Sequence, residues 1–429
     1  MSVVERIDAR GRATTDAAGI AGRLRSLAPG GDTVAEPVAR IVADVATRGD
    51  EALLEHVARL DRADGAPAEP LVVPAAELDA AVAELAPALR AALELAIANV
   101  GAVARATTNE DRDVELPQGQ LVRVREVPVR RAAIYVPGGR APNPSTVVMG
   151  VVTARAAGVD DVVLCSPSDD PVLRAASRLA GADRVYRMGG AHAVSALVHG
   201  TATVDPVDVL VGPGNLWVQE AKRQLSGRVG IDGFAGPSDL AVVADGAADP
   251  ELVALDLAAQ GEHGAGSLVV LLTPDAGLAD AVQALLERGV GGGAPAAETG
   301  AAYAVALVDD AAAGLAVAEA FAPEHLELVG STVEPLAGAV RSAGCLFVGP
   351  GAATAFGDYV VGSNHTLPTD GAARFASTLS ARTFRRTMCE VHLRDAAEAL
   401  APAGAAIADA EGFVVHAASM RARQNGGTA

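Results

Sequence analysis

The chain has 429 residues, a formal net charge of -19, and 50% hydrophobic but only 3% aromatic residues. This length exceeds what one hydrophobic core usually organises, so we expect two or more lobes. The negative charge would repel phosphate backbones and anionic lipid surfaces, which argues against nucleic acid or a membrane as partner. The N-terminus lacks the apolar core of a secretion signal and no uninterrupted apolar run has membrane-spanning length, so a soluble cytoplasmic protein is expected.

The first predicted elements are helices. From Asp16 to about Arg105, apolar residues recur at spacings of three and four, and from Asp111 to Val127 the sequence becomes polar and then alternating. The first pattern is typical of amphipathic helices and the second of strands or a short connection. Residues 1–127 are therefore predicted to form a helical N-terminal region that joins the second of two lobes.

A strand-and-helix rhythm follows and predicts an α/β fold with two Rossmann-like parallel-sheet lobes. In the first lobe, 128–237, strands are predicted at 132–136, 162–165, 184–188 and 207–211, with helices from Ser145, Pro171, Ala191 and Asn215. In the second lobe, 238–372, strands are predicted at 240–243, 268–272, 304–308, 326–329 and 346–348. Residues 373–429 are predicted to be a C-terminal helical segment, with helices over 375–386 and 396–423.

Glycine-rich turns end three predicted strands of the first lobe, at 137–139, 189–190 and 212–215. None follows the GxGxxG pattern, so the usual dinucleotide fingerprint is missing. Each turn taken singly is about as consistent with a plain tight turn. Three such turns at the carboxyl ends of parallel strands favour a nucleotide crevice, because glycine lets the backbone approach a phosphate or ribose.

Histidines next to carboxylates or carboxamides gather in the C-terminal half. The pairs are Gln260 with His263, Glu324 with His325, Asp358 with His365, and Glu411 with His416. Such pairs suit metal binding or proton transfer, and the isolated Cys165, Cys345 and Cys389 offer no thiolate site, so any metal would use nitrogen and oxygen ligands. Each pair alone is matched or outweighed by a plainer interpretation, such as a helix cap or solvated polar residues.

Seven motifs make the chain resemble the histidinol dehydrogenase family over nearly its whole length. They are YVPGGRAPNPST, VGPGNLWVQEAKRQLSGRVGID, AGPS, DLAAQGEHG, APEHLEL, GDYVVGSNHTLPT and AEGFVVHA. The resemblance implies a zinc-dependent, NAD-linked enzyme that oxidises L-histidinol through L-histidinal to L-histidine. It also implies a homodimer with shared active sites, in which the C-terminal segment crosses to the partner.

The same resemblance implies roles for individual residues. Glu324 and His325 would be the catalytic acid and base, with His325 taking the hydroxyl proton and Glu324 activating the water that hydrates the aldehyde. The zinc ligands would be Gln260, His263, Asp358 and, from the partner, His416. The substrate would meet Ser238, Gln260, His263, His325, Asp358, His365, Glu411 and His416. NAD would meet Tyr135, Asn215 and His192, where His192 replaces the glutamine usual in the family.

Two alternatives stay open at this point. A related zinc and NAD dehydrogenase could act on another small alcohol, such as a sulfonated propanediol, although Tyr359 and the stretch 374–380 resemble the histidinol enzymes. A zinc hydrolase or a catalytically silent nucleotide-binding protein could share the fold, since fold does not dictate function.

Overall fold

The structure, a computed structural model, describes residues 4–28, 34–62, 70–138, 142–234 and 236–424. Contacts divide the chain into two units. The first comprises Met1–Thr107 with Arg130–Phe384, and the second comprises Thr108–Val129 with Arg385–Ala429. Each unit is described by itself below.

A five-stranded parallel sheet forms the first lobe, in the order β6-β5-β4-β7-β8. Its strands are β4 (Arg131–Tyr135), β5 (Asp161–Ser166), β6 (Arg184–Arg187), β7 (Val209–Val211) and β8 (Gly230–Ile231). The helices between them are α6 (Pro144–Ala156), α7 (Pro171–Ala180), α8 (Gly190–His199) and α9 (Leu216–Leu225). The strand-and-helix rhythm predicted for this lobe is confirmed within a few residues.

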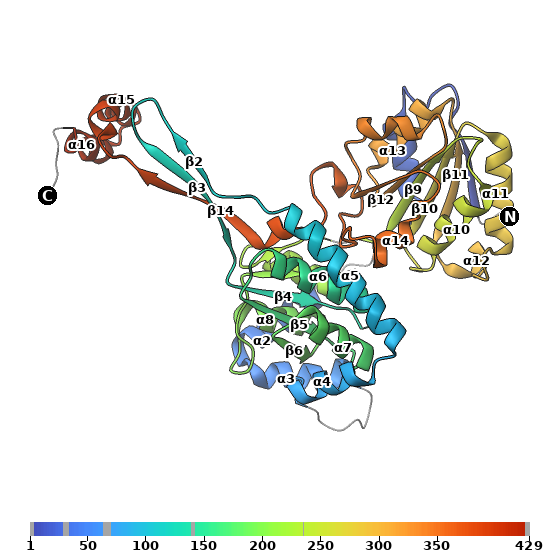
Figure 1. Ribbon diagram of the computed structural model, residues 1–429, viewed down its shortest axis with the longest axis horizontal. Helices are drawn as coiled ribbons and strands as arrows, with labels where there is room; N and C mark the ends of the chain where they lie inside the picture. Colours follow the sequence, from blue (N-terminus) through green and yellow to red (C-terminus); the bar gives the residue numbers. More distant parts are fainter. Residues whose placement is uncertain (1–3, 29–33, 63–69, 139–141, 235, 425–429) are drawn as a thin grey trace. The chain divides into compact units, whose positions relative to one another are not determined.

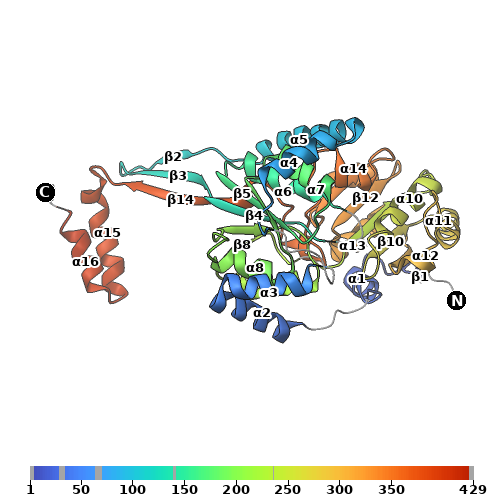
Figure 2. The same cartoon turned by 90° about the horizontal axis from the view of Figure 1, so that it is seen from below.

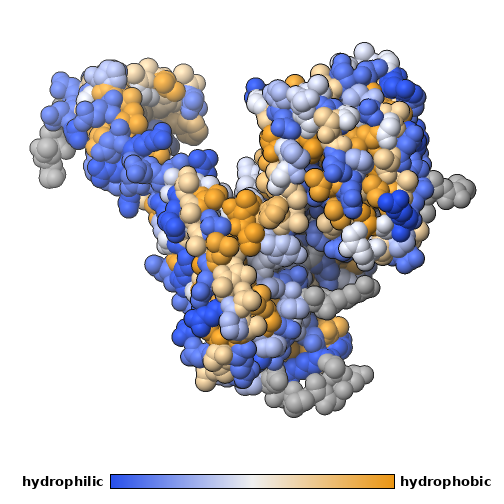
Figure 3. All heavy atoms as spheres, turned by 45° about the vertical axis from the view of Figure 1, so that its right-hand side comes forward, coloured by the Kyte–Doolittle hydropathy of each residue, from blue (hydrophilic) through white to orange (hydrophobic). Residues whose placement is uncertain are grey.

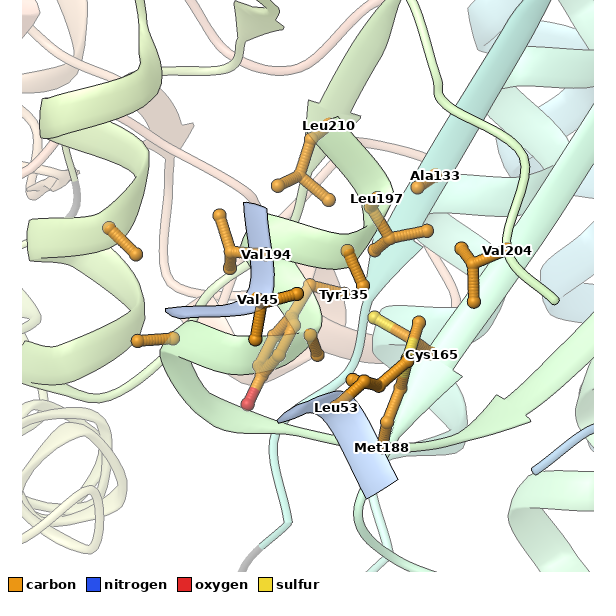
Figure 4. Close-up of a cluster of buried hydrophobic side chains, with 14 of the residues drawn as sticks. Val45, Leu53, Ala133, Tyr135, Cys165, Met188, Val194, Leu197, Val204 and Leu210 are labelled. Carbon is orange, nitrogen blue, oxygen red and sulfur yellow. The ribbon is translucent and has the colours of Figure 1, made fainter. Parts of the chain in front are cut away.

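Four N-terminal helices pack on this lobe: α2 (Ala35–Arg48), α3 (Asp50–Leu60), α4 (Ala75–Glu84) and α5 (Pro87–Ala106). α2 packs against α8, α4 against α7, and α5 against α6. Figure 4 shows Val45 and Leu53 of the first two helices beside Tyr135, Met188 and Val194 of the sheet lobe. These N-terminal residues thus complete the hydrophobic core of the first lobe.

Among the described residues, α5 is the one helix that is long and apolar enough to span a membrane by length and composition, with a mean hydropathy of 1.3. No uninterrupted apolar run of that length is expected from the sequence, and Arg90, Glu94 and Arg105 do lie within this helix. α5 lies against α6, and Leu93, Ala96 and Val100 on it are buried. One face of the helix therefore packs on the protein, while 28% of its apolar stretch is buried.

A six-stranded parallel sheet forms the second lobe, in the order β1-β11-β10-β9-β12-β13. Its strands are β1 (Val4–Asp8), β9 (Asp239–Ala244), β10 (Leu268–Thr273), β11 (Ala302–Leu307), β12 (His325–Val329) and β13 (Cys345–Val348). Helices α1 (Ala17–Arg25) and α13 (Ala311–Phe321) lie side by side on one face (Figure 2). Helices α10 (Pro250–Gly261) and α11 (Ala276–Arg288) cover the other.

Shorter elements complete this unit: α12 (Ala296–Thr299), α14 (Thr354–Tyr359), and the 3-10 helices η1 (Glu334–Ala339), η2 (Ala372–Arg374) and η3 (Ala381–Phe384). Aspartate side chains accept backbone N–H bonds at the starts of several helices, namely α7, α10, α11 and α13. Because the first N–H groups of a helix have no partner within it, these caps fix where the helices begin.

The second unit is an antiparallel sheet followed by two helices (Figure 1). The strands, in the order β14-β3-β2, are β2 (Arg112–Glu115), β3 (Leu121–Pro128) and β14 (Arg385–His392), and the helices are α15 (Ala396–Ala410) and α16 (Val414–Arg421). The strands predicted between 111 and 127 and the helices within 396–423 are confirmed.

Two predictions require correction. A helix over 375–386 is wrong, because this segment contains only η3 before β14 begins at Arg385. The N-terminal residues also do not join the second lobe as one region. Only β1 and α1 do so, whereas α2 to α5 pack on the first lobe and residues 108–127 belong to the second unit.

Candidate active site

The end of α10 brings Gln260 and His263 to the second lobe's sheet. Gln260 is 2% exposed, and its Nε2 has no hydrogen-bond partner. The helix ends at Gly261, and His263 N donates to Gln260 O at 3.3 Å, so the chain continues for a further turn. His263 is exposed in the single chain, but the protein atoms around its ring lower its pKa.

Glu324 and His325 lie where β12 begins, and both are buried. The carboxyl groups of Glu324 and Asp239 each accept a hydrogen bond from the other residue's backbone N–H. Asp239 N donates to Glu324 Oε2 at 3.0 Å, and Glu324 N donates to Asp239 Oδ1 at 2.6 Å. Ser238 also hydrogen-bonds the Glu324 carboxyl group. The carboxyl group of Glu324 is therefore held in one position at the start of two neighbouring strands.

The imidazole of His325 lies between two carboxyl groups. Its Nδ1 is 3.7 Å from Glu324 Oε2, and its Nε2 is 3.7 Å from Asp358 Oδ1. These distances are longer than hydrogen bonds. Adjacent residues at the start of a strand point to opposite faces, which is consistent with the absence of a hydrogen bond between the Glu324 and His325 side chains.

Asp358 and His365 come from α14 and the loop after it. His365 Nδ1 donates to the backbone carbonyl of Asp358 at 3.0 Å, which leaves Nε2 to accept from the hydroxyl of Thr146, at 3.3 Å. These two bonds fix the ring and its tautomer. Nearby, Asn364 donates to Met149 O at 3.0 Å and to Thr153 Oγ1 at 3.1 Å, and so ties the loop to α6.

Burial dominates the electrostatics of this cluster. It lowers the pKa of His325 to about 3 and that of His365 to about 4, so both imidazoles are neutral at neutral pH. It raises the pKa of Asp358 to about 6. The pKa of Glu324 is raised well above its usual range by burial first, and then by the charges of Asp239 and Asp358. Neutral imidazoles beside carboxyl groups that lack a positive partner form an environment that favours a cation.

This cluster lies at the amino ends of the strands, since Ser238 precedes β9 and Glu324 precedes β12. In open parallel sheets, ligands usually bind beyond the carboxyl ends. The location arises because α10 runs back across the sheet and delivers its C-terminal residues to the amino edge. The rule that ligands bind at the carboxyl ends of strands would not have found this cluster. Sequence reasoning also did not assign Asp239 and Thr146 to it.

A second concave site lies in the first lobe, at the carboxyl ends of its strands. A cavity of about 1030 Å³ is lined by residues that include Tyr135, Pro137, Gly138, Gly190, His192, Asn215 and Trp217. Asn215 caps α9 by accepting from Trp217 N and Val218 N. Gly139, predicted to line this crevice, lies outside the described residues. All three predicted glycine-rich turns contribute residues to this wall.

His192 lines the same cavity and is 1% exposed. Its Nε2 is 2.8 Å from Asp61 Oδ2, and its ring stacks on that of His56, with centroids 5.7 Å apart. His56 in turn lies 3.0 Å from Asp44. Asp61 thus occupies one nitrogen of His192, and the other, Nδ1, is buried without a partner.

Comparisons with known proteins agree with this geometry. A family model described as histidinol dehydrogenase matches residues 28–424. The chain is 42% identical to histidinol dehydrogenase of Gluconobacter oxydans, covering 96% of this chain and 99% of that one, and 42% identical to that of Nocardia farcinica, covering 97% of each. The crystal structure of histidinol dehydrogenase from Elizabethkingia anophelis superposes with a TM-score of 0.90 at 29% identity, covering 99% of this chain and 98% of that one.

The chain belongs to the histidinol dehydrogenase family. Membership makes it an NAD-dependent oxidoreductase with histidinol dehydrogenase function in histidine biosynthesis. The comparisons do not favour the alternative of another small alcohol such as a sulfonated propanediol. An oxidoreductase is also neither a zinc hydrolase nor a catalytically silent protein.

The side chains that the resemblance names as zinc ligands offer nitrogen and oxygen atoms, which zinc accepts as donors. Within the described residues, no three side chains of His, Cys, Asp or Glu cluster to hold a metal. Of the zinc ligands that the resemblance implies, the first unit supplies His263 and Asp358, which are of these residue types, and Gln260, which is not. The neutral imidazole of His263 and the carboxyl group of Asp358 are kinds of ligand that zinc accepts, and the buried Gln260 amide would have to bind through its oxygen, because its unpartnered Nε2 is a donor.

The remaining two predicted residues, Glu411 and His416, belong to the second unit of the chain. Glu411 follows α15 and His416 lies in α16, and both are exposed. The ring of His416 packs on Phe413, with centroids 5.2 Å apart. Their role at an active site stays a prediction.

Proposed function

We propose that the chain oxidises L-histidinol through L-histidinal to L-histidine, with one zinc ion per subunit and two NAD molecules reduced per turnover. The observation that carries this proposal is the buried cluster at the amino edge of the second sheet. There, Glu324 and His325 lie beside Asp358 on one side and the end of α10 on the other. The family relationship supplies the substrate.

We assign the zinc ligands as Gln260, His263, Asp358 and the partner subunit's His416. When bound, zinc would hold the substrate's amine and imidazole in place. Ser238, His365 and Glu411 would contact the substrate around it. The fixed tautomer of His365 supports its proposed contact with the substrate, because a ring held by two hydrogen bonds keeps one orientation toward a ligand.

We assign the first proton transfer to His325. The hydroxyl proton would pass to the imidazole as the substrate carbon gives up its hydride. Burial lowers the pKa of His325 to about 3, which keeps the ring unprotonated before this step. The two flanking carboxyl groups would then stabilise the imidazolium that forms.

We assign the second step to Glu324, which would take a proton from the water that adds to the aldehyde. On loss of a second hydride to bound NAD, the hydrate would become the carboxylic acid, which would release its remaining proton to solvent as the carboxylate. A carboxyl group whose pKa is raised by burial is a stronger base than an ordinary glutamate once it is ionised. The two bonds from Asp239 and Ser238 hold it in place for this role.

NAD would bind in the cavity of the first lobe, with Tyr135, His192 and Asn215 in contact. Tyr135 hydroxyl accepts from Gly190 N at 3.0 Å, so the ring holds the glycine turn that lines the cavity. A cavity at the carboxyl ends of parallel strands, with small residues in its wall, suits a dinucleotide. In this proposal residues 128–237 bind NAD and 238–372 hold zinc and the catalytic pair.

The C-terminal segment, 373–429, would complete the site of a partner subunit in a cytoplasmic homodimer. Exposed apolar side chains support such an interface: Ile407, Phe413, Val414 and Val415 are 54–75% exposed in the single chain. On the face seen in Figure 3, hydrophobic residues gather in patches among hydrophilic ones. Water-exposed side chains of this size favour burial against another protein surface.

Stoichiometry with purified protein tests the proposed function. L-Histidinol should yield two NADH per molecule oxidised, chelation should abolish the absorbance, and zinc should restore it. A sulfonated propanediol serves as the comparison substrate and should yield none. Absence of NADH with histidinol in zinc-loaded protein would contradict the proposal.

A further inference from the structure

Three elements that carry site residues each carry a second polar residue on the same face, one helical turn or two strand positions from the site residue. The pairs are Asp256 and Gln260 on α10, His325 and Glu327 on β12, and Thr354 and Asp358 on α14. Helix residues four apart and strand residues two apart share a face. Asp256, Glu327 and Thr354 therefore form a second polar layer, in which each residue lies next to the site residue on its own element.

The members of this layer are bonded to one another. Glu327, 1% exposed, accepts at Oε1 from Thr354 N at 2.9 Å and from the Thr354 hydroxyl. It thereby caps the first turn of α14 from a neighbouring strand. On its other side, Glu327 lies against the carboxyl group of Asp256, within reach of a hydrogen bond. Two carboxyl groups can share such a bond only if one of them carries a proton.

The surroundings make a polar group here costly. Glu327 pairs with Val242 of β9, and Val242 packs with Val253 and Leu257 of α10 in an apolar core. The pKa of Glu327 is raised by burial and by Asp256, and that of Asp256 by burial, so the shared proton stays in place at neutral pH. An apolar side chain would pack here without the desolvation penalty. The presence of a carboxyl group instead is explained if its bonds serve to position the elements.

We propose that Asp256, Glu327 and Thr354 form a proton-sharing triad that locks α10, β12 and α14 together. The triad thereby holds Gln260, His325 and Asp358 at the spacing that the metal and the substrate require. This inference rests on the zinc ligands assigned above. The three are positioning residues, since each acts through the site residue on its own element.

Substitution of Glu327 tests the triad. Glu327→Gln keeps one acceptor for Thr354 and one donor for Asp256, so zinc affinity and kcat should stay within about threefold of wild type. Glu327→Leu removes both bonds at similar volume, and zinc affinity should fall by about 10- to 100-fold. Zinc affinity is measured by competition with a chromogenic chelator, and the fold of the metal-free protein by circular dichroism.

Asp245→Asn is the matched control. Asp245 is also a buried carboxylate of this sheet, but it follows the carboxyl end of β9 and accepts from the backbone and hydroxyl of Thr332. This change should lower the unfolding midpoint and leave zinc affinity unchanged. If Glu327→Leu does not fold, Thr354→Val removes the hydroxyl alone and should weaken zinc binding about threefold or more.

The outcomes separate the two proposals. Wild-type zinc affinity in folded Glu327→Leu, or in Thr354→Val where the former does not fold, would overturn the triad alone. An equal loss in Glu327→Gln and Glu327→Leu would do the same, because the conservative variant keeps both bonds. Failure of the wild-type chain to bind zinc would instead refute the assigned ligands, and the triad's role would fall with them.

Discussion

His192 brings an imidazole to the wall of the first-lobe cavity, and Asp61 already occupies one of its nitrogens. The ring also stacks on His56, so it has little freedom to turn toward a ligand. Glutamine at this position would present a donor and an acceptor together. His192 therefore contributes packing to the cavity but less hydrogen bonding than a carboxamide.

His192→Gln should tighten NAD binding. A glutamine amide can donate one N–H to Asp61 and still offer a second N–H and its carbonyl to the cofactor, whereas His192 Nδ1 can only accept, and one net hydrogen bond of about 1 kcal/mol corresponds to about a fivefold lower Kd. Isothermal titration with NAD measures the change. His199→Gln, on the same helix but outside the cavity lining, is the control and should leave Kd unchanged. An unchanged Kd in His192→Gln would refute the prediction.

The shared proton of the triad should make stability depend on pH. Burial and the neighbouring Asp256 raise the pKa of Glu327 from 4.5 to about 8 in the folded chain. A group with a raised folded pKa contributes stability below its unfolded pKa, and this contribution is lost as pH rises through the folded value. Because the group titrates near 4.5 in the unfolded chain and near 8 in the folded one, the midpoint of urea unfolding of metal-free protein should fall between about pH 5 and pH 8 and level off above, more in wild type than in Glu327→Gln.

At the scale of elements, helix packing around the first sheet rests on a few fully buried side chains. Leu53 of α3 is 0% exposed and lies in the core beside Val45 and Tyr135 (Figure 4). Leu54, the next residue, is 48% exposed. The two leucines thus have the same helical propensity but opposite environments.

Leu53→Ala should lower the free energy of unfolding by about 2–5 kcal/mol, because it leaves a cavity in a packed core. Leu54→Ala should cost about 1 kcal/mol or less, since its side chain stays largely in water. Urea titration followed by circular dichroism compares the two. Equal losses would show that the core around Leu53 does not depend on this side chain.

The sheet strands could be predicted from sequence because buried parallel strands are short apolar runs between turn residues. β14 could not, since Arg385–His392 mixes charged and apolar residues without a regular alternation and its partner β3 lies far away in sequence. The pairing of Glu327 with Asp256 was also missed. Its members are far apart in the chain, and a single glutamate within HLELV looks like a solvated residue.

Candidate site residues could be named from motifs, but their three-dimensional arrangement could not be derived from spacing. Gln260, Glu324 and Asp358 are separated by long stretches, and only the fold brings their elements together. Each pair alone was matched or outweighed by a structural explanation. The physical signal that distinguishes them, burial without a charged partner, exists only in the folded chain.

At the scale of the whole molecule, the proposed homodimer makes each active site depend on two chains. Mixing two inactive variants tests this. Glu324→Gln disables the catalytic pair, and His416→Ala removes the ligand assigned to the partner. Refolded together in equal amounts, they should form mixed dimers with one intact site, about a quarter of all sites if pairing is random.

Activity of the mixture, measured as NADH formed from histidinol, is compared with that of each variant refolded alone. Both single variants should be nearly inactive and the mixture clearly active. If His416 served its own chain, no mixed dimer would contain an intact site, and mixing would restore nothing. Light scattering confirms that the refolded variants are dimers.

The second unit is built from two distant stretches, since β3 lies between α5 and β4 while β14 follows η3. β14 bonds to β3 over eight residues, Arg385–His392 against Leu121–Pro128. A chain shortened at Phe384 would therefore not be a clean removal of a tail. It would strip β3 of its partner and leave a row of open N–H and C=O groups, a template on which other chains could pair and aggregate.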